Sequence, residues 1–324
     1  MKNLMKGFLV GLAALALAGG SAMAKWPNDK NVTIVVNWPP GASIDLTARL
    51  LADYWSKKYN ATFIVENRAG ATGNIGQNFV AKAAPDGYTL LMTTPGPAAN
   101  NAMTFKSLPY DPLKDFSGIS QMTQDTMGIT VSKKRQDLAT IKGFIDYAKK
   151  NPGKLNIAHP GAGTYAHMIL LKLQDEMKTE FNLVPYKGGN EMVTDLMGGT
   201  IDGIVNFVAP YFAQYTAGDF IPIVVISDER NSMLEKVPTL KESGIDFSAA
   251  PWTIMTAPKG TPKEVINEMS KAMAEAMKDP TIAQKIAGMN TTAKTSTPEQ
   301  TDALVKAEQD KWRPIIVKYK ITSE

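Results

Sequence analysis

The stretch Val32-Thr-Ile-Val-Val36, followed by Asn37-Trp-Pro-Pro-Gly-Ala-Ser43, decides the fold class of this chain. Its first part is a short apolar run rich in β-branched residues, as expected of a strand buried on both faces. Its second part is a turn rich in Pro and Gly, after which residues from about Ile44 to Lys58 follow a helical apolar period. The segment predicts a strand, a turn and a helix in direct succession.

The same alternation continues toward the C-terminus. Strands are expected at Thr62–Glu66 and Thr89–Thr93, with a helix at Asn74–Ala83 between them. Such a β-α-β-α-β series favours a parallel sheet. Further strands are expected near Ile119–Thr123, Gly128–Ser132, Leu155–Ala158, Asn182–Pro185, Gly203–Phe207 and Ile221–Ser227, and further helices at Ile141–Lys150, Thr164–Met177 and Asn190–Met197.

These elements form two α/β units, of which the second runs from near Thr126 to near Ala250. The part that follows is expected to be mostly helical. Thr261-Pro-Lys-Glu264 carries a helix-start signal, with Thr as N-cap and Pro at the first helical position. Met269 and Met273 repeat every fourth residue behind it, so we interpret the methionines as helix core.

The N-terminus has the pattern of a secretory signal. Lys2 and Lys6 precede an apolar run from about Gly7 to Ala18. Ala22-Met-Ala24 then offers the small residues that a signal peptidase reads. The apolar run is shorter than the roughly 20 residues that span a bilayer. We therefore expect residues 1–24 to be a cleaved signal peptide and the protein to work outside the cytoplasm.

Composition limits the class of protein further. The chain has no cysteine, so neither a lipid anchor nor a disulfide is expected. Its net charge is +4, and Lys2 and Lys6 supply two of these charges. Such a mild charge gives no reason to expect a nucleic-acid partner. Residues 25–324 are more than a single hydrophobic core usually accommodates, which suggests two domains.

Catalytic signatures are missing from the sequence. There are only two histidines, His159 and His167, so the clustered ligands of a metal site are not expected. Neither a G-x-S-x-G elbow nor a Walker A motif occurs. Gly70-Ala-Thr-Gly-Asn-Ile-Gly76 has a spacing that differs from that of a dinucleotide loop. We expect no catalytic residue, no metal and no cofactor.

Two junctions between a strand and a helix have the composition of anion sites. They are Pro40-Gly-Ala-Ser43 and Gly161-Ala-Gly-Thr164, one in each α/β unit. Free backbone N–H groups at a helix start, beside small side chains, can hold a carboxylate or phosphate. The alternative is that Ser43 and Thr164 only cap their helices. The spacing leaves both interpretations open.

The first junction lies in Val36-Asn-Trp-Pro-Pro-Gly-Ala-Ser-Ile-Asp45, which resembles the first loop of a known family, the tripartite tricarboxylate transporter receptors. These are the Bug-type, TctC-like periplasmic solute-binding proteins. Motifs similar to that family follow in order along the chain: Val65-Glu-Asn-Arg68, Gly70–Gly76, Ala84-Pro-Asp-Gly-Tyr-Thr-Leu90, Leu108-Pro-Tyr-Asp-Pro112, Asn151-Pro-Gly-Lys-Leu-Asn156, Val184-Pro-Tyr-Lys-Gly188, Asp195-Leu-Met-Gly-Gly199, Val237-Pro-Thr-Leu240 and Ala257-Pro-Lys-Gly-Thr-Pro262. Together they are specific, although no single motif would be.

The resemblance implies an α/β fold of the periplasmic binding protein type II-like class, with two lobes around a central ligand cleft and two chain crossings. Residues 25–125 and 251–324 would form lobe 1, and residues 126–250 would form lobe 2. The implied protein is a monomeric periplasmic receptor. It would capture an organic carboxylate, either a di- or tricarboxylate or an aromatic acid, and deliver it to the integral-membrane permease subunits of a tripartite tricarboxylate-type transporter.

Two alternatives remain at this point. A receptor of the same fold could feed a signalling partner instead of a permease, and the sequence does not separate the two. An exported hydrolase on this fold is disfavoured because the nucleophile elbow is missing.

The resemblance also implies which residues contact the ligand. Those that match the ligand loops of the family are Trp38, Gly41, Ala42, Ser43, Asp45, Thr94, Gly96, Gly163, Thr164, Tyr165, His167 and Asn206. Trp38 stands where the family usually has Phe, and Ala42 and Ser43 stand where it usually has Gly. The bulk of Trp38 and Tyr165 favours an aromatic or bulky acid.

Four of these positions have roles that the resemblance leaves open or gives only as a hypothesis. Thr164 is expected to bond the carboxylate, whereas His167 either contacts the ligand or is only packed. Asp45 either favours the helix dipole or acts on the ligand, by pairing an ammonium group or ordering water. Asn206 stands where Asp is common, and its neutral amide suggests a second carboxylate on the ligand.

Overall fold

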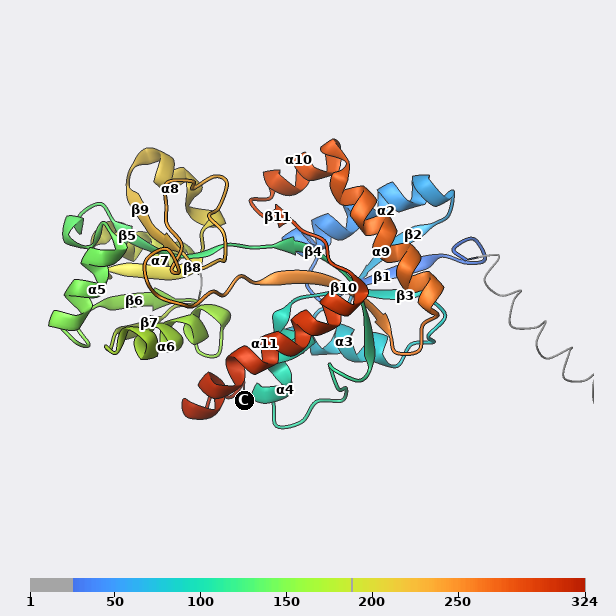
Figure 1. The fold of residues 1–324 in the computed structure, drawn as a ribbon, viewed down its shortest axis with the longest axis horizontal. Helices are drawn as coiled ribbons and strands as arrows, with labels where there is room; N and C mark the ends of the chain where they lie inside the picture. Colours follow the sequence, from blue (N-terminus) through green and yellow to red (C-terminus); the bar gives the residue numbers. More distant parts are fainter. Residues whose placement is uncertain (1–25, 188, 324) are drawn as a thin grey trace, which may run out of the picture.

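The structure, a computed structural model, describes residues 26–187 and 189–323. The expected signal segment, residues 1–24, lies outside the described residues. Two α/β lobes lie side by side along the long axis of the molecule (Figure 1). Among the helices of the described ranges, none is both long enough and apolar enough to cross a bilayer.

The first lobe is built on a six-stranded sheet in the order β11-β4-β10-β3-β1-β2. Its strands are β1 (Val32–Val36), β2 (Phe63–Asn67), β3 (Thr89–Thr93), β4 (Phe116–Gln124), β10 (Trp252–Pro258) and β11 (Thr292–Ala293). β1 pairs in parallel with β2 and β3, as predicted. β10 is antiparallel to both β3 and β4, so the sheet as a whole is mixed although its three N-terminal strands are parallel. The cause is a C-terminal strand in a region expected to be mostly helical.

Helices cover both faces of this sheet (Figure 1). They are α2 (Ser43–Tyr59), α3 (Asn74–Ala81), α9 (Lys263–Lys278) and α10 (Pro280–Gly288). Trp55 of α2 shares one fully buried cluster with Met269 and Met273 of α9. Burial of each such side chain contributes about 1.5–3 kcal/mol. The interpretation of these two methionines as core is confirmed.

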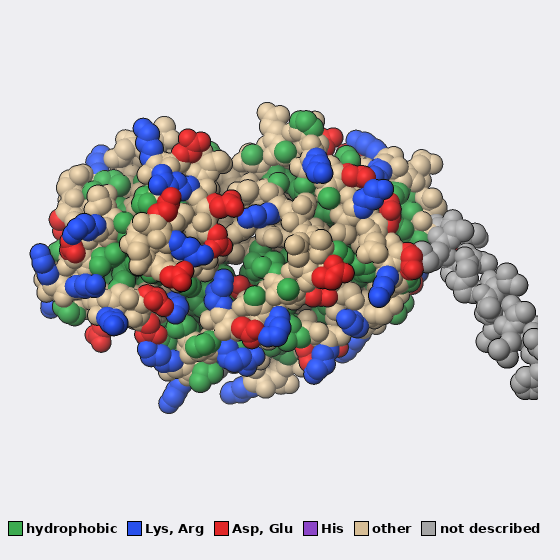
Figure 2. Space-filling model, viewed as in Figure 1, with side chains coloured by type: hydrophobic (Ala, Val, Ile, Leu, Met, Phe, Trp, Pro, Cys, Tyr) green, Lys and Arg blue, Asp and Glu red, His purple; other side chains and the backbone are tan. Residues whose placement is uncertain are grey.

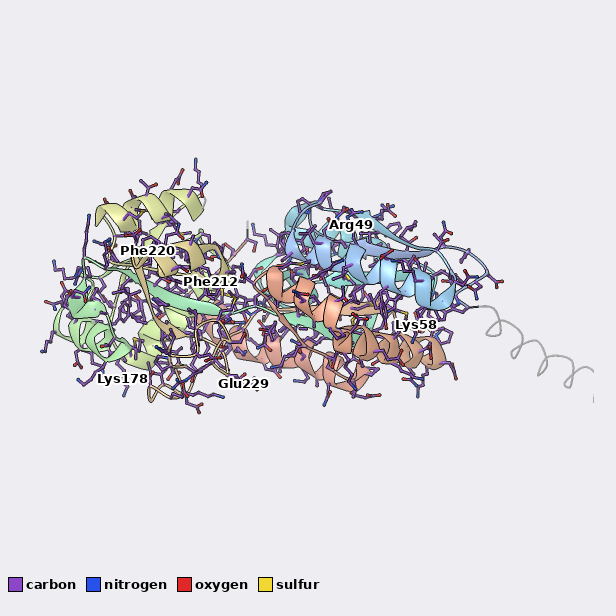
Figure 3. All side chains as sticks on the ribbon, turned by 90° about the horizontal axis from the view of Figure 1, so that it is seen from above. Arg49, Lys58, Lys178, Phe212, Phe220 and Glu229 are labelled. Carbon is purple, nitrogen blue, oxygen red and sulfur yellow. The ribbon has the colours of Figure 1, made fainter. Side chains whose placement is uncertain are left out.

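The second lobe has a five-stranded sheet in the order β7-β6-β8-β5-β9. Its strands are β5 (Met127–Ser132), β6 (Asn156–His159), β7 (Asn182–Pro185), β8 (Gly203–Phe207) and β9 (Phe220–Val225), and its helices are α5 (Ile141–Lys150), α6 (Tyr165–Met177), α7 (Gly189–Gly198) and α8 (Phe212–Ala217). β6 is parallel to β7 and β8, whereas β5 is antiparallel to β8 and β9. Phe212 and Phe220 mark this lobe in Figure 3.

The chain passes between the lobes from β4 to β5 and again from β9 to β10. The two crossing segments are joined where the N–H of Asp125 donates to the carbonyl of Pro251 over 2.8 Å. A third connection is α11 (Pro298–Lys318), which begins against β4 in the first lobe and runs toward the lower edge of the second lobe in Figure 1. Trp312 and Ile316, in its second half, belong to the core of the second lobe.

Candidate functional site

A cavity of about 530 Å³ lies between the two lobes. Its walls come from the start of α2, the segment after β3, the start of α6 and the two crossing segments. The surface is notched between the lobes in Figure 2, and charged side chains of both signs are scattered over the rest of that face. The cavity therefore brings together segments that are far apart in the sequence.

Most of the predicted site residues line this cavity. They are Trp38, Ala42, Ser43, Thr94, Gly96, Gly163, Thr164 and Tyr165. Gly41, Asp45, His167 and Asn206 are not among its lining residues. The first group therefore faces a space of ligand size, and the second group does not.

Asp45 is buried behind the first junction and holds the turn in shape. Its carboxylate accepts from the N–H of Gly41 over 2.9 Å, from Nδ2 of Asn67 over 2.8 Å, and from Arg49. Burial by itself raises the pKa of Asp45, but the hydrogen bonds from Arg49, Gly41 and Asn67 outweigh it and hold the pKa below its usual value. Gly41 has φ +87°, which favours glycine at this position.

The start of α2 opens on the cavity without a side-chain cap. Ala42 is the N-cap residue, with φ −66° and ψ 154°, and it makes no side-chain capping hydrogen bond. Ser43 and Ile44, the first residues of the helix, line the cavity. The positive end of a 17-residue helix therefore faces the cavity with backbone N–H groups that a ligand can use.

The start of α6 is arranged differently, because its side chains already bond within the turn. The Thr164 hydroxyl donates to the carbonyl of Gly161 over 2.7 Å and accepts from the N–H of His167 over 3.3 Å. The N–H of Gly163 donates to Nδ1 of His167 over 3.1 Å. Both Thr164 and His167 are thus used to shape the loop, and a ligand bond from Thr164 stays a prediction.

His159 and His167 lie behind this loop as a stacked pair, with ring centroids 4.8 Å apart. Burial lowers the pKa of His159, although a hydrogen bond to Gly161 partly offsets the shift. Burial and the nearby charge of His159 lower the pKa of His167 to about 4. Both rings are therefore neutral near pH 7, and the bond from Gly163 requires this of His167 because its Nδ1 has to accept.

Aromatic side chains wall the cavity. The indole N–H of Trp38 donates to Oγ1 of Thr94 over 3.1 Å, which fixes the ring beside the segment after β3. Tyr165 packs edge-on against the fully buried Trp312, with centroids 5.2 Å apart. Asn206 lies elsewhere: its Nδ2 donates to the hydroxyl of Tyr211 over 3.1 Å, and it lines a separate hollow of the second lobe.

Sequence reasoning missed several polar residues at the cavity, among them Asn100, Asp125 and Trp252. Asp125 is the one charged side chain among the described residues that line it. Asn100 belongs to the π-helical turn Gly96–Asn100, and Trp252 begins β10. The only signal in the sequence was that Asp125 and Trp252 flank the two expected crossings.

A cavity between two α/β lobes, with a helix start from each lobe in its wall, defines a two-lobed binding protein of the Venus flytrap type. The model of the tripartite tricarboxylate transporter family receptor matches residues 47–321, and the chain belongs to this family of periplasmic solute-binding receptors. The family and the type II-like fold predicted from the sequence are confirmed.

Similar proteins agree with this assignment. Protein BugT of Bordetella pertussis is 30% identical over 287 residues, which cover 88% of this chain and 88% of BugT. A TctC solute-binding protein from Polaromonas has a TM-score of 0.82 and 26% identity, covering 90% of this chain and 99% of that one. The R. palustris protein Rpa4515, solved with adipate, has a TM-score of 0.74 and 28% identity, covering 92% and 99%.

Proposed function

We propose that this protein is a periplasmic receptor that captures an organic carboxylate between its lobes and delivers it to the permease subunits of a tripartite tricarboxylate-type transporter. The signal pattern at residues 1–24 supports the location. Within the proposal, residues 25–125 and 251–324 form lobe 1 and residues 126–250 form lobe 2. The receptor carries out no reaction on its ligand.

The uncapped start of α2 at an inter-lobe cavity is the observation that carries this proposal. No Lys or Arg is found among the described residues that line the cavity. Arg49, Lys58 and Lys178, the labelled cations in Figure 3, all lie away from the junction of the lobes. A carboxylate would therefore be held by backbone N–H groups and the helix dipole, which need no basic side chain.

Closure of the lobes completes the site in this proposal. The α2 start belongs to one lobe and the α6 start to the other, so rotation about the two crossings changes their separation. A carboxylate between them would favour the closed arrangement. The adipate in Rpa4515 supports a carboxylate as the ligand class of this chain.

The proposal is tested first by a thermal-shift screen of mono-, di- and tricarboxylates and aromatic acids. A ligand that binds the native state raises the melting temperature. Calorimetric titration of each hit then gives its affinity. If no carboxylate in the panel raises the melting temperature, the proposal is wrong.

Ser43→Pro tests whether the backbone at α2 holds the carboxylate. Proline suits the first helical position, and Ala42 already has the extended ψ that precedes proline, so the helix should be retained. The substitution removes one N–H donor, and we expect affinity for the carboxylate hits to fall about 10- to 100-fold. Ser43→Ala is the matched control, since it removes the hydroxyl and keeps the N–H. Equal affinities for both variants would contradict the backbone role.

A further inference from the structure

The part of the cavity wall that the two chain crossings form has a chemistry opposite to that of the helix starts. Asp125 lies in the first crossing and is bonded through its N–H to Pro251 of the second. The other described residues that line the cavity, Asn100, Trp252 and Thr253 among them, are all uncharged. The cavity thus has N–H donors at α2 and a lone carboxylate at the crossings.

The Asp125 carboxylate has no cationic partner among the ion pairs of the described residues. Burial raises the pKa of Asp125, and a hydrogen bond from Thr291 offsets only part of the shift. A partly buried carboxylate without a counter-charge is costly unless a bound group pairs with it. A cationic nitrogen on the ligand would supply that pairing.

Three further polar atoms of lining residues lack a hydrogen-bond partner among the described residues, namely the hydroxyl of Tyr165 and two others. Oδ1 of Asn100 and the indole Nε1 of Trp252 are buried and make no hydrogen bond within the described part of the chain. Their side chains are only 4% and 3% exposed, respectively. Buried polar groups without a partner are rare in folded proteins, and here they line a space of ligand size. Asn100 Oδ1 and Asp125 both accept hydrogen bonds, so they suit a donor on the ligand.

We propose that Asp125 makes this receptor selective for amino-carboxylates, with the ligand carboxylate at the start of α2 and its ammonium group at Asp125. The inference rests on the proposed function and adds the class of ligand to it. Asn100 accepts a second hydrogen bond from the ammonium group, and Trp252 donates to an oxygen of the ligand. A second carboxylate at this end would meet Asp125 and be repelled.

The test compares ligands that differ only by the amino group. The pairs are L-glutamate with glutarate, L-phenylalanine with 3-phenylpropionate, and 4-aminobutyrate with butyrate. Affinities are measured by calorimetric titration of the mature protein and of Asp125→Asn, an isosteric change that removes the charge. We expect at least one amino-carboxylate to bind the wild type about tenfold or more tightly than its partner, and Asp125→Asn to abolish that preference.

Asp53→Asn is the matched control, because Asp53 is exposed on α2 and pairs with Lys57 away from the cavity. It should leave the preference unchanged, and melting curves check that both variants are folded. The inference is overturned if the wild type prefers the deamino partners, if it binds no member of the pairs, or if Asp125→Asn keeps the preference. Carboxylate binding that is weakened by Ser43→Pro would still support the proposed function in each of those cases.

Discussion

Asp45 and Asp125 show how the surroundings of a carboxylate separate a structural role from a ligand-directed one. Asp45 is fully enclosed and accepts hydrogen bonds from Gly41, Asn67 and Arg49. Its structural interpretation, which the sequence left open beside a role at the ligand, fits these contacts. Asp125 has no such set of donors and faces the cavity.

Asp45→Asn should destabilise the protein by about 1–3 kcal/mol, because the amide loses the charge and presents N–H groups where only acceptors fit. The folded-state pKa of Asp45 lies below its unfolded value. The ionised Asp45 therefore stabilises the folded state fully above the unfolded pKa near 4, and this stabilisation is lost as pH falls through the folded pKa. Urea denaturation at pH 7 and at pH 3 measures both effects.

Asp53→Asn serves as the control for Asp45 also, since its side chain is exposed and its pair with Lys57 lies on the same helix. We expect this change to stay within about 0.5 kcal/mol. If Asp45→Asn lowers the free energy of unfolding no more than the control does, the buried hydrogen bonds of Asp45 do not hold the turn.

The local sequence predicted the cavity residues at the turns before α2 and α6, but not those at or near the segments that cross between the lobes. Ser43 and Thr164 sit at strand–turn–helix patterns that can be recognised within ten residues. Asn100, Asp125 and Trp252 come from three separate segments that only the tertiary fold brings to one cavity. No periodicity or turn signal marks such positions, so single-sequence reasoning had no means of combining them.

The same distinction holds for whole elements. The predicted bounds of Val32–Val36, Thr89–Thr93, Ile141–Lys150 and Gly203–Phe207 agree with the structure because their apolar runs are bounded by turn residues. β10 was not predicted because it lies in the C-terminal part, whose helix-start signals and helical periodicity led to the expectation of helix. No helix or strand was predicted at the π-helical turn Gly96–Asn100, because Pro and Gly dominate its start.

The loop before α6 depends on a neutral His167, which gives a prediction for pH. The folded-state pKa of His167 is lowered to about 4, below its unfolded value. The stabilisation is therefore complete above about pH 6.5 and decreases as pH falls from there toward 4. His167 is partly exposed, so after discounting for solvent screening we expect a loss on the order of 1 kcal/mol.

His167→Gln isolates this effect, because glutamine can accept a hydrogen bond from the N–H of Gly163 and does not titrate in this range. Melting temperatures of both proteins are measured from pH 8 to pH 4. The melting temperature of the wild type should fall relative to that of His167→Gln as pH falls below 6.5, so that any advantage of the wild type shrinks or reverses. A constant difference across the range would show that protonation of His167 does not bear on stability.

At the scale of the whole molecule, α11 connects the two lobes that the cavity separates. Its first turns lie against β4, where Oδ1 of Asp302 accepts from the N–H of Gly118 over 2.7 Å. Its last turn reaches α6, where Lys318 pairs with Asp175 over 2.5 Å. The helix therefore shares its contacts between the lobe built on β1–β4 and the core of the other lobe. Motion of the lobes has to preserve or rearrange these contacts.

Trp312 is the main anchor of α11 in the second core. It is fully buried, it packs against Tyr165 and Phe247, and its indole N–H donates to Oε1 of Glu308 over 2.7 Å. Trp312→Ala leaves a large void and removes this donor, so we expect a loss of about 3–5 kcal/mol in the free energy of unfolding. Ligand affinity should fall as well, because Tyr165 lines the cavity and loses the ring that holds it.

Val317→Ala is the control on the same helix, because Val317 is 69% exposed, and its effect should stay within about 0.5 kcal/mol. Urea denaturation followed by far-UV circular dichroism gives the stabilities, and calorimetric titration with a carboxylate hit gives the affinities. If α11 connects the lobes, Trp312→Ala lowers both quantities while Val317→Ala lowers neither. A large loss of stability with unchanged affinity would mean that the anchor supports the second core alone and that the cavity wall at Tyr165 is held independently of α11.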